Sequence, residues 1–244
     1  MEIERRTVLI TGANRGLGRA LVLACLKAGA GDVFAGARQP ESLAKLIETA
    51  QDDRIKPLRL DITLEADIRV AADLVGRVDI LINNAGVCVF GSVLRAEMAE
   101  LQREVETNYF GALRMARAFA PAMMQQGNGL IVNVASILGK VSIPAMGNYC
   151  AMKAALFSLS QALRGELSPH GVRVITVFPG TIDTDMSRGF EGPKMNVDQA
   201  AAEIIDAIRA EKLETAIGDG ARGVVDGLAS DPLAIERAFA EYRA

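Results

Sequence analysis

Short apolar runs alternate along the chain with longer segments whose apolar residues recur at helical spacing. Strands that alternate with helices are typical of βαβ units, in which neighbouring strands run parallel. The apolar runs contain few polar residues, so helices should cover both faces of the sheet. The pattern therefore predicts an α/β fold, a single domain over residues 1–244 with a doubly wound parallel sheet. The expected strands are 7–11, 32–37, 55–60, 78–83, 130–134 and 172–178, and the expected helices are 17–28, 41–50, 64–75 and about 104–125.

Two segments near the carboxyl end add to this picture. Residues 186–197 contain Gly189, Gly192 and Pro193, which favour a loop, and we expect this loop to be a mobile lid over the substrate. Residues 232–242 have apolar positions at helical spacing and predict a final helix.

Composition narrows the class of protein. The chain has 244 residues, of which 50% are hydrophobic, enough for one large core. A net charge of −3 without a concentrated basic run argues against a nucleic-acid-binding surface. No apolar stretch is long enough to span a membrane, and the few residues before the first strand leave no room for a signal peptide. Three cysteines without metal or redox spacing favour reduced thiols, so we expect a cytoplasmic protein.

A glycine-rich segment joins the first expected strand to the first expected helix. Glycines at such a turn let the backbone approach a pyrophosphate, and the helix amino terminus adds N–H groups and a favourable dipole. The spacing T-G-x-x-x-G-x-G departs from the pattern G-x-G-x-x-G, and a tight turn without a ligand is the alternative. The segment reads Thr11-Gly12-Ala13-Asn14-Arg15-Gly16-Leu17-Gly18.

The end of the second expected strand indicates which dinucleotide binds. An acidic residue there accepts hydrogen bonds from the ribose of NAD, whereas a 2′-phosphate requires a nearby arginine. The strand ends in Gly36-Ala37-Arg38, without an acid, and Arg15 in the glycine turn can reach the same phosphate. We therefore predict NADP(H) rather than NAD(H). The alternative is that both arginines are solvated surface residues.

Three polar residues form a candidate site for proton transfer. Tyr149 and Lys153 are four residues apart and share one face of a helix, and Ser136 follows the apolar run 130–135. A free tyrosine has a pKa near ~10 and is a sluggish acid at neutral pH. We expect the Lys153 ammonium to lower that pKa. Cys150 is a weaker candidate for a nucleophile, because its neighbouring position turns it about 100° away on the helix.

These motifs together resemble the short-chain dehydrogenase/reductase family, in its compact form, over nearly the whole chain. The resemblance implies a Rossmann fold. It also implies that residues 11–18 hold the cofactor phosphates and that Asp61 and the Ile62 amide hold the adenine. The other residues expected to line the cofactor are Asn83, Ala85, Gly86, Tyr149, Lys153, Pro179, Gly180, Ile182 and Thr184, the last two near the nicotinamide carboxamide and the adjacent phosphate.

The resemblance also implies a catalytic role for each polar residue. Tyr149 would be the general acid in reduction and the general base in oxidation, and Lys153 would hold the nicotinamide ribose. Ser136 would orient the carbonyl, and Asn108 would bind a water that links Lys153 to solvent. No metal is expected, because metal-ligand clusters are lacking and the single histidine, His170, lies in a turn.

The residues expected around the substrate are mostly apolar, which favours a lipophilic ketone, aldehyde or secondary alcohol over a sugar, although apolar residues at these positions are equally compatible with core packing. They are Ser136, Leu138, Tyr149, Met186 and Phe190, together with residues 87–90, 137 and 141–146. The sequence therefore predicts an NADP(H)-dependent carbonyl reductase or secondary alcohol dehydrogenase.

Two alternative functions remain open. A 3-oxoacyl-[acyl-carrier-protein] reductase has a similar length and cofactor, but residues 224–228 only partly echo its Val-Asp-Gly-Gly turn. A non-catalytic NADP(H) sensor commonly lacks the proton-transfer residues, which this chain keeps. By resemblance we expect a homodimer or homotetramer that assembles through the helices near residues 97–125 and 149–167.

Overall fold

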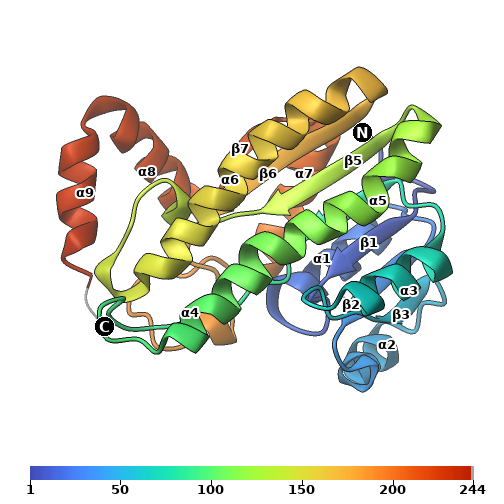
Figure 1. Ribbon diagram of the computed structural model, residues 1–244, viewed down its shortest axis with the longest axis horizontal. Helices are drawn as coiled ribbons and strands as arrows, with labels where there is room; N and C mark the ends of the chain where they lie inside the picture. Colours follow the sequence, from blue (N-terminus) through green and yellow to red (C-terminus); the bar gives the residue numbers. More distant parts are fainter. Residues whose placement is uncertain (243–244) are drawn as a thin grey trace.

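The computed structural model describes residues 1–242, and these form a parallel sheet between two layers of helices (Figure 1). The strand order is β3-β2-β1-β4-β5-β6-β7, so the chain builds outward from β1 to β3 and then returns beside β1 with β4. In such a sheet a ligand binds where the order reverses, beyond the carboxyl ends of β1 and β4. The strands are β1 (Val8–Thr11), β2 (Val33–Ala37), β3 (Ile55–Arg59), β4 (Ile80–Asn83), β5 (Gly129–Val134), β6 (Val172–Pro179) and β7 (Glu214–Ile217). The predicted doubly wound Rossmann fold is confirmed.

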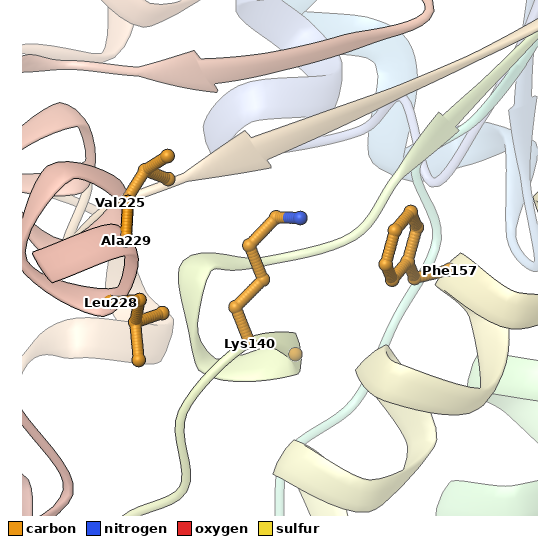
Figure 2. Close-up of a pocket in the computed structure, with 6 residues that line it drawn as sticks. Lys140, Phe157, Val225, Leu228 and Ala229 are labelled. Atoms are coloured by element: carbon orange, nitrogen blue, oxygen red, sulfur yellow. The ribbon is translucent and has the colours of Figure 1, made fainter. Parts of the chain in front are cut away.

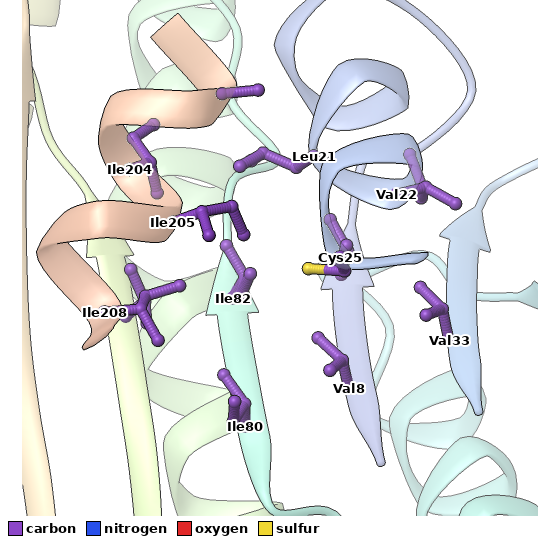
Figure 3. Close-up of a cluster of buried hydrophobic side chains, with 14 of the residues drawn as sticks. Val8, Leu21, Val22, Cys25, Val33, Ile80, Ile82, Ile204, Ile205 and Ile208 are labelled. Atoms are coloured by element: carbon purple, nitrogen blue, oxygen red, sulfur yellow. The ribbon is translucent and has the colours of Figure 1, made fainter. Parts of the chain in front are cut away.

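One face of the sheet is covered by α1 (Gly16–Lys27), α2 (Ala44–Ala50) and α7 (Val197–Ala210). Figure 3 shows Leu21 of α1 and Ile204 of α7 above Ile82 of β4. Fully burying a side chain of this size contributes about 1.5–3 kcal/mol. The helix α7 lies outside the helices expected from sequence.

The opposite face is covered by α3 (Glu65–Val75), α5 (Ala112–Gln126) and α6 (Gly147–Leu167). Along β4, Ile80 and Ile82 face one layer and Leu81 faces the other. This double burial explains why the strands are apolar without alternation.

The long helix expected at residues 104–125 is divided into three parts. It begins earlier, with α4 (Met98–Val105), continues as a π-helical turn over Glu106–Gly111, and ends as α5. Gly111 lies in close contact at the end of the π turn, where an added Cβ would be 2.6 Å from Cδ1 of Ile62. Such π turns are frequent at functional sites.

The carboxyl-terminal part of the chain ends in two helices. Residues 224–228, which only partly echo a Val-Asp-Gly-Gly turn, lie inside α8 (Asp219–Ser230). The turn comes earlier, at Gly218, whose φ is +88°. Gly227 is instead the point where α9 (Pro232–Ala240) crosses α8, because an added Cβ would lie 2.5 Å from Cδ1 of Ile235. In Figure 1 the pair α8 and α9 extends beyond the sheet as an arm.

Five short 3₁₀ turns complete the described chain, namely Pro40–Leu43, Ile137–Gly139, Pro144–Met146, Ser168–His170 and Asp185–Ser187. The first replaces the beginning of the helix expected at residues 41–50. The expected loop 186–197 begins in the last of these turns and ends where α7 begins, and Met195 forms a parallel bridge with Ile182. Across residues 1–242, the helices are all too short or too polar to be a membrane span.

Candidate active site

Four polar side chains are buried together beyond the ends of β4 and β5. Only 1% of Asn108, 8% of Ser136, 8% of Tyr149 and 4% of Lys153 is exposed. Tyr149 and Lys153 lie on successive turns of α6, with Lys153 Nζ 5.5 Å from the centre of the Tyr149 ring. The same Nζ donates a hydrogen bond of 2.8 Å to the carbonyl oxygen of Val134, at the end of β5. The helix that carries the phenol is thereby tied to the strand that leads to Ser136.

Ser136 is held in place by the turn that follows β5. Its backbone is extended, and its Oγ accepts a hydrogen bond of 3.1 Å from the Leu138 N–H at the start of the 3₁₀ turn. Gly139 ends this turn directly against α6, where an added Cβ would lie 2.8 Å from the backbone carbon of Lys153. Because glycine has no Cβ, the Ser136 turn can approach the helix of Tyr149 closely.

Asn108 lies in the π turn and fixes the loop after β4. Its Oδ1 accepts a hydrogen bond of 2.9 Å from Val87 N–H, and its Nδ2 donates one of 2.8 Å to the Val87 carbonyl. Gly86 separates Asn108 from Lys153, since an added Cβ would lie 2.9 Å from Asn108 Oδ1 and 3.6 Å from Lys153 Nζ. The structure thus brings Asn108 to the Lys153 side of the site. Its role in binding a relay water stays a prediction.

Burial dominates the electrostatics of the catalytic pair. It raises the pKa of Tyr149 above its ordinary value, and Cys88 adds to that rise, while a hydrogen bond from Ser136 opposes it. Burial also lowers the pKa of Lys153 to about 8. The expected lowering of the phenol's pKa is therefore not found in this structure, because desolvation by burial is the largest influence on Tyr149 and raises its pKa. The phenol is consequently protonated at neutral pH and ready to act as an acid.

The glycine turn has a backbone that only glycines permit. Gly12 has φ +67° and Gly16 has φ +50°, both in the left-handed region. A Cβ on Gly18 would lie 2.1 Å from the Gly12 carbonyl oxygen, which leaves no room for any side chain. Asn84 supports the turn by donating from Nδ2 to the carbonyl oxygens of Thr11 and Gly12, at 2.9 and 3.3 Å. A bare backbone at the amino end of α1 fits the pyrophosphate of a dinucleotide.

The segment after β6 closes over this turn from the other side. The methyl carbon Cγ2 of Thr184 lies 3.3 Å from where a Cβ of Gly16 would stand. Gly180 is held by its N–H, which donates to the Ile217 carbonyl at 3.1 Å. Pro179 ends β6, and Ile182 packs partly buried against the core below α1. The structure therefore places Thr184 beside the glycine turn, whereas Gly180 lies against Ala221 of α8.

The two arginines expected at the 2′-phosphate are exposed. Arg15 is an exposed side chain whose NH1 lies 3.3 Å from Asp185 Oδ2 in the turn after Thr184. Arg38 follows β2 and is exposed, with no ion pair to any group in residues 1–242. Arg38 is therefore accessible beyond the carboxyl end of β2, whereas Arg15 forms an ion pair with Asp185.

The remaining predicted cofactor residues divide into accessible and internal ones. Asp61 is half-buried and caps its own loop, accepting from the N–H and hydroxyl of Thr63 at 2.9 and 2.7 Å. Asn83 points into the sheet, where its Nδ2 donates to Asn133 Oδ1 at 2.9 Å. Its side chain therefore steadies β4 against β5 and does not face the glycine turn. Among the other predicted residues, Ile62 is buried, while Asn14, Leu17, Ala85 and Gly86 are half-buried.

An apolar cluster packs around the phenol. Of the predicted substrate residues, Leu138 and Phe190 pack against this cluster, whereas Met186 lies outside it with 40% of its surface exposed. Contact of these residues with a substrate stays a prediction. The sequence did not indicate Phe239 of α9, which packs against the same cluster. The other members are Ile143, Ala145, Met146, Cys150 and Cys88.

Aromatic side chains join the loop 186–197 to the end of the chain. The ring of Phe190 stacks on that of Tyr242, with centroids 5.4 Å apart and planes at 12°. Tyr242 also contacts Phe239, at 5.7 Å between centroids. Through these rings, the end of the arm formed by α8 and α9 contacts the loop 186–197 near Tyr149.

A hollow of about 480 Å³ lies beside this site, between the turn after Ser136 and α8 (Figure 2). Its walls are Gly139, Lys140, Phe157, Val225, Leu228 and Ala229. The charge of Lys140 is already balanced, since its Nζ lies 3.3 Å from Glu214 Oε2 and within 4.3 Å of the Phe157 ring centre. The hollow therefore offers no proton-transfer group. No group of three or more potential metal ligands occurs within residues 1–242.

A buried residue and its half-buried partner next to the site escaped the sequence prediction. Glu104 of α4 is fully buried, and its Oε2 accepts a hydrogen bond of 2.5 Å from Nδ2 of Asn148, the residue before Tyr149. In the sequence Glu104-Val105-Glu106, no local feature distinguishes the buried Glu104 from the half-exposed Glu106.

The chain is similar to a known protein family and to solved structures. A family model described as short chain dehydrogenase matches residues 6–193. A short-chain dehydrogenase from Burkholderia cenocepacia, crystallised in complex with NADP, superposes with a TM-score of 0.92 at 40% identity over 98% of this chain and 99% of that one. A short-chain dehydrogenase from Streptomyces avermitilis gives a TM-score of 0.83 at 33% identity, over 98% of both chains.

Curated relatives include two kinds of reductase. The 3-oxoacyl-[acyl-carrier-protein] reductase FabG of Vibrio harveyi is 33% identical over 208 residues, which cover 84% of this chain and 82% of that protein. Dehydrogenase/reductase SDR family member 7B of Xenopus tropicalis is 36% identical over 197 residues, or 76% of this chain. The match spans only 63% of the length of that frog protein.

Proposed function

The chain belongs to the short-chain dehydrogenase family, and we propose that it is an NADP(H)-dependent oxidoreductase that interconverts a ketone or aldehyde with an alcohol. In this role it works chiefly as a carbonyl reductase on lipophilic substrates. The observation that carries the proposal is the joint burial of Asn108, Ser136, Tyr149 and Lys153 at the end of the sheet where the strand order reverses.

The chain's own groups account for proton transfer to the carbonyl. A ketone that accepts a hydride develops negative charge on its oxygen, which requires a hydrogen-bond donor and then a proton. The Tyr149 phenol, whose pKa is raised by burial, holds the proton and delivers it to that oxygen. The Ser136 hydroxyl orients the carbonyl beside the phenol. Lys153, anchored on Val134, places a positive charge near the tyrosinate that forms.

The cofactor proposal rests on the shape of the glycine turn and on charge. NADPH, when bound, supplies the hydride. The amino end of α1 accepts its pyrophosphate, because Gly12, Gly16 and Gly18 keep the backbone bare. Arg38 meets the 2′-phosphate at the end of β2, where NAD-binding proteins of this fold carry an acid. The Burkholderia cenocepacia protein, similar in fold and sequence, was crystallised in complex with NADP.

The substrate proposal rests on the cluster around the phenol. Leu138, Phe190 and Phe239 lie against Tyr149 with other apolar side chains, and aliphatic and aromatic surfaces favour lipophilic groups. In this proposal the loop 186–197 is a lid, and Phe190 is its contact with the substrate.

A second candidate function is reduction of 3-oxoacyl thioesters, since several similar proteins bear that name. A screen separates the two functions. NADPH consumption is measured with small, bulky aromatic and steroid-like ketones and with acyl-thioester ketones. We expect the highest kcat/KM with a bulky lipophilic ketone. Turnover only with thioesters would support the second candidate, and tight NADPH binding without any turnover would indicate a sensor.

We also propose self-association through the helical face of α4 and α5. Leu94, Met98 and Phe110 are large apolar residues that remain exposed near this face, and a second copy would cover them. Sedimentation of the full chain should show a dimer or tetramer, and Met98→Glu should shift it toward the monomer. A monomeric wild-type chain would contradict this assembly.

A further inference from the structure

The helix α4 buries a carboxylate where an apolar residue is normally found. Glu104 is its only fully buried side chain, with 0% exposed, whereas the apolar Leu101 and Val105 of the same helix are only half-buried. A buried ionised carboxylate costs several kcal/mol unless hydrogen bonds replace its water. Glu104 therefore needs a compensating set of partners.

Each carboxylate oxygen of Glu104 has one donor from a different segment. Its Oε1 accepts from the Val89 N–H at 2.6 Å, and its Oε2 accepts from Nδ2 of Asn148 at 2.5 Å. Hydrogen bonds to an ionised acceptor are among the strongest in proteins. The first bond reaches the loop that follows β4, and the second reaches the first turn of α6.

Both tethered segments belong to the active site. Asn148 directly precedes Tyr149 on α6. The loop is held twice, because Asn108 lies one turn after Glu104 and binds the backbone of Val87. Cys88 lies in this loop between Val87, which Asn108 binds, and Val89, which Glu104 binds, and it packs against the cluster of Tyr149. One side chain therefore connects the phenol's helix to the wall opposite it.

We propose that Glu104 is a positioning residue of the active site, which sets the Tyr149 turn of α6 and the loop Val87–Val89 at a fixed separation. It touches no reacting atom and acts through Asn148 and Val89. The proposal rests on the proposed carbonyl reductase activity, within which a small displacement of the phenol or of the substrate wall lowers the rate of the chemical step.

The first experiment separates positioning from folding. Glu104→Ala removes both bonds, whereas Glu104→Gln keeps the shape and one acceptor oxygen. The glutamine therefore keeps the bond from the Val89 N–H but meets the NH2 of Asn148 with an NH2 of its own, unless the Asn148 amide reverses. We expect kcat for ketone reduction to fall about tenfold to a hundredfold in Glu104→Ala with KM for NADPH nearly unchanged, and to be partly restored in Glu104→Gln. Glu106→Gln is the matched control, because Glu106 is half exposed and pairs with Arg114 on the surface. It should behave as the wild type.

Asn148→Ala provides a test if Glu104→Ala does not fold. It removes one of the two bonds from the other partner, so its effect on kcat should be smaller than that of Glu104→Ala. A wild-type kcat in folded Asn148→Ala would contradict the proposal.

A thiol assay tests the loop without using turnover. Cys25 and Cys150 are buried and Cys88 is half-buried, so Cys88 should react first with an aromatic disulfide reagent. Release of the loop in Glu104→Ala should speed this reaction about tenfold, and Cys88→Ser should abolish the fast phase. The faster thiol reaction is expected even if no ketone is turned over. An unchanged thiol rate, or a fall in folded protein with full kcat per folded site, would overturn the proposal.

Discussion

The proposed catalytic cluster and the surfaces proposed to select cofactor and substrate are built in opposite ways. At the cluster, Asn108, Ser136, Tyr149 and Lys153 are all at least nine-tenths buried. At the selecting surfaces, the Arg15 side chain is 71% exposed and Tyr242 is 45% exposed. Hydrogen bonds to β5 and to the loop after β4 hold the cluster in place. At the surfaces, Arg15 is held by an exposed ion pair with Asp185, and Phe190 stacks on Tyr242, which follows α9.

This difference separates two kinds of constraint. A buried polar group is fixed by its partners, so replacing it removes an interaction and leaves others unsatisfied. An exposed group is weakly held and can be exchanged at little cost to the fold. Changes at the cluster should therefore abolish the reaction, whereas changes at the surfaces should alter what is bound.

The sharpest test of the cluster is Tyr149→Phe. It removes the hydroxyl that delivers the proton and keeps the ring, which packs with Cys150 and Ile143. We expect kcat for ketone reduction to fall about a thousandfold, as for loss of a general acid. The dissociation constant for NADPH, measured by fluorescence, should change less than about twofold, a shift well below 1 kcal/mol. Near wild-type turnover would show that another group supplies the proton.

The second test concerns the cost of burying Lys153. Burial lowers its pKa from 10.5 to about 8, so below pH 8 the folded protein keeps a buried ammonium at a cost of about 3 kcal/mol. Between pH 8 and 10.5 the unfolded chain binds a proton that the folded protein has lost, so this cost disappears as pH rises. Lys153→Met removes this cost but also loses the hydrogen bond to Val134, which is worth about 1 kcal/mol. The substitution should therefore raise the free energy of unfolding by about 2 kcal/mol at neutral pH.

Urea unfolding at several pH values measures this difference. The gain should be largest below pH 8, fall by about 3 kcal/mol between pH 8 and 10.5, and become a small loss above that range, because only the missing bond to Val134 then remains. Turnover should be lost throughout. Lys27→Met, at an exposed position in the last turn of α1, is the control and should show no such pH dependence. A constant difference at all pH values would mean that burial does not perturb Lys153.

The sequence predicted the cluster because its signals are local. Tyr149 and Lys153 share a helix face through their spacing, and Ser136 follows a strand whose apolar run is unmistakable. The glycine turn is equally local, since Gly12 and Gly16 have positive φ values within one short segment. The doubly wound parallel sheet followed from the alternation of strands and helices.

Tertiary packing decided the features that sequence reasoning missed. Glu104 and Glu106 look alike in the chain, and only the path of the loop after β4 makes one of them buried. The sign of the pKa shift at Tyr149 depends on how many segments exclude water from it. Phe239 gave no signal because its contact with the Tyr149 cluster joins positions 90 residues apart. Burial and long-range contact are not encoded in spacing.

The exposed surface at the cofactor is tested by Arg38→Asp. A charge-assisted bond to the 2′-phosphate is lost and a repulsion is introduced, so NADPH binding should weaken about tenfold to a hundredfold. A carboxylate at this position can accept a bond from the NADH ribose, so NADH binding should hold or improve. Arg5→Asp makes the same charge change before β1, at the opposite end of the sheet, and should affect neither. Equal losses for both cofactors would contradict selection by Arg38.

The smallest effect is expected at the arm, from Phe239→Ala. Phe239 packs against the cluster of Tyr149 and supports Tyr242, on which Phe190 stacks. Its removal takes apolar surface from one side of the substrate only, so KM for a bulky lipophilic ketone should rise about fivefold, a loss near 1 kcal/mol. A small ketone that does not reach α9 should keep its KM. Leu233→Ala, at a position of α9 that is 60% exposed, should change neither value. If Phe239→Ala lowered kcat equally for small and bulky ketones, the arm would belong with the catalytic cluster, and the division between a buried site and an exchangeable surface would fail at this end of the molecule.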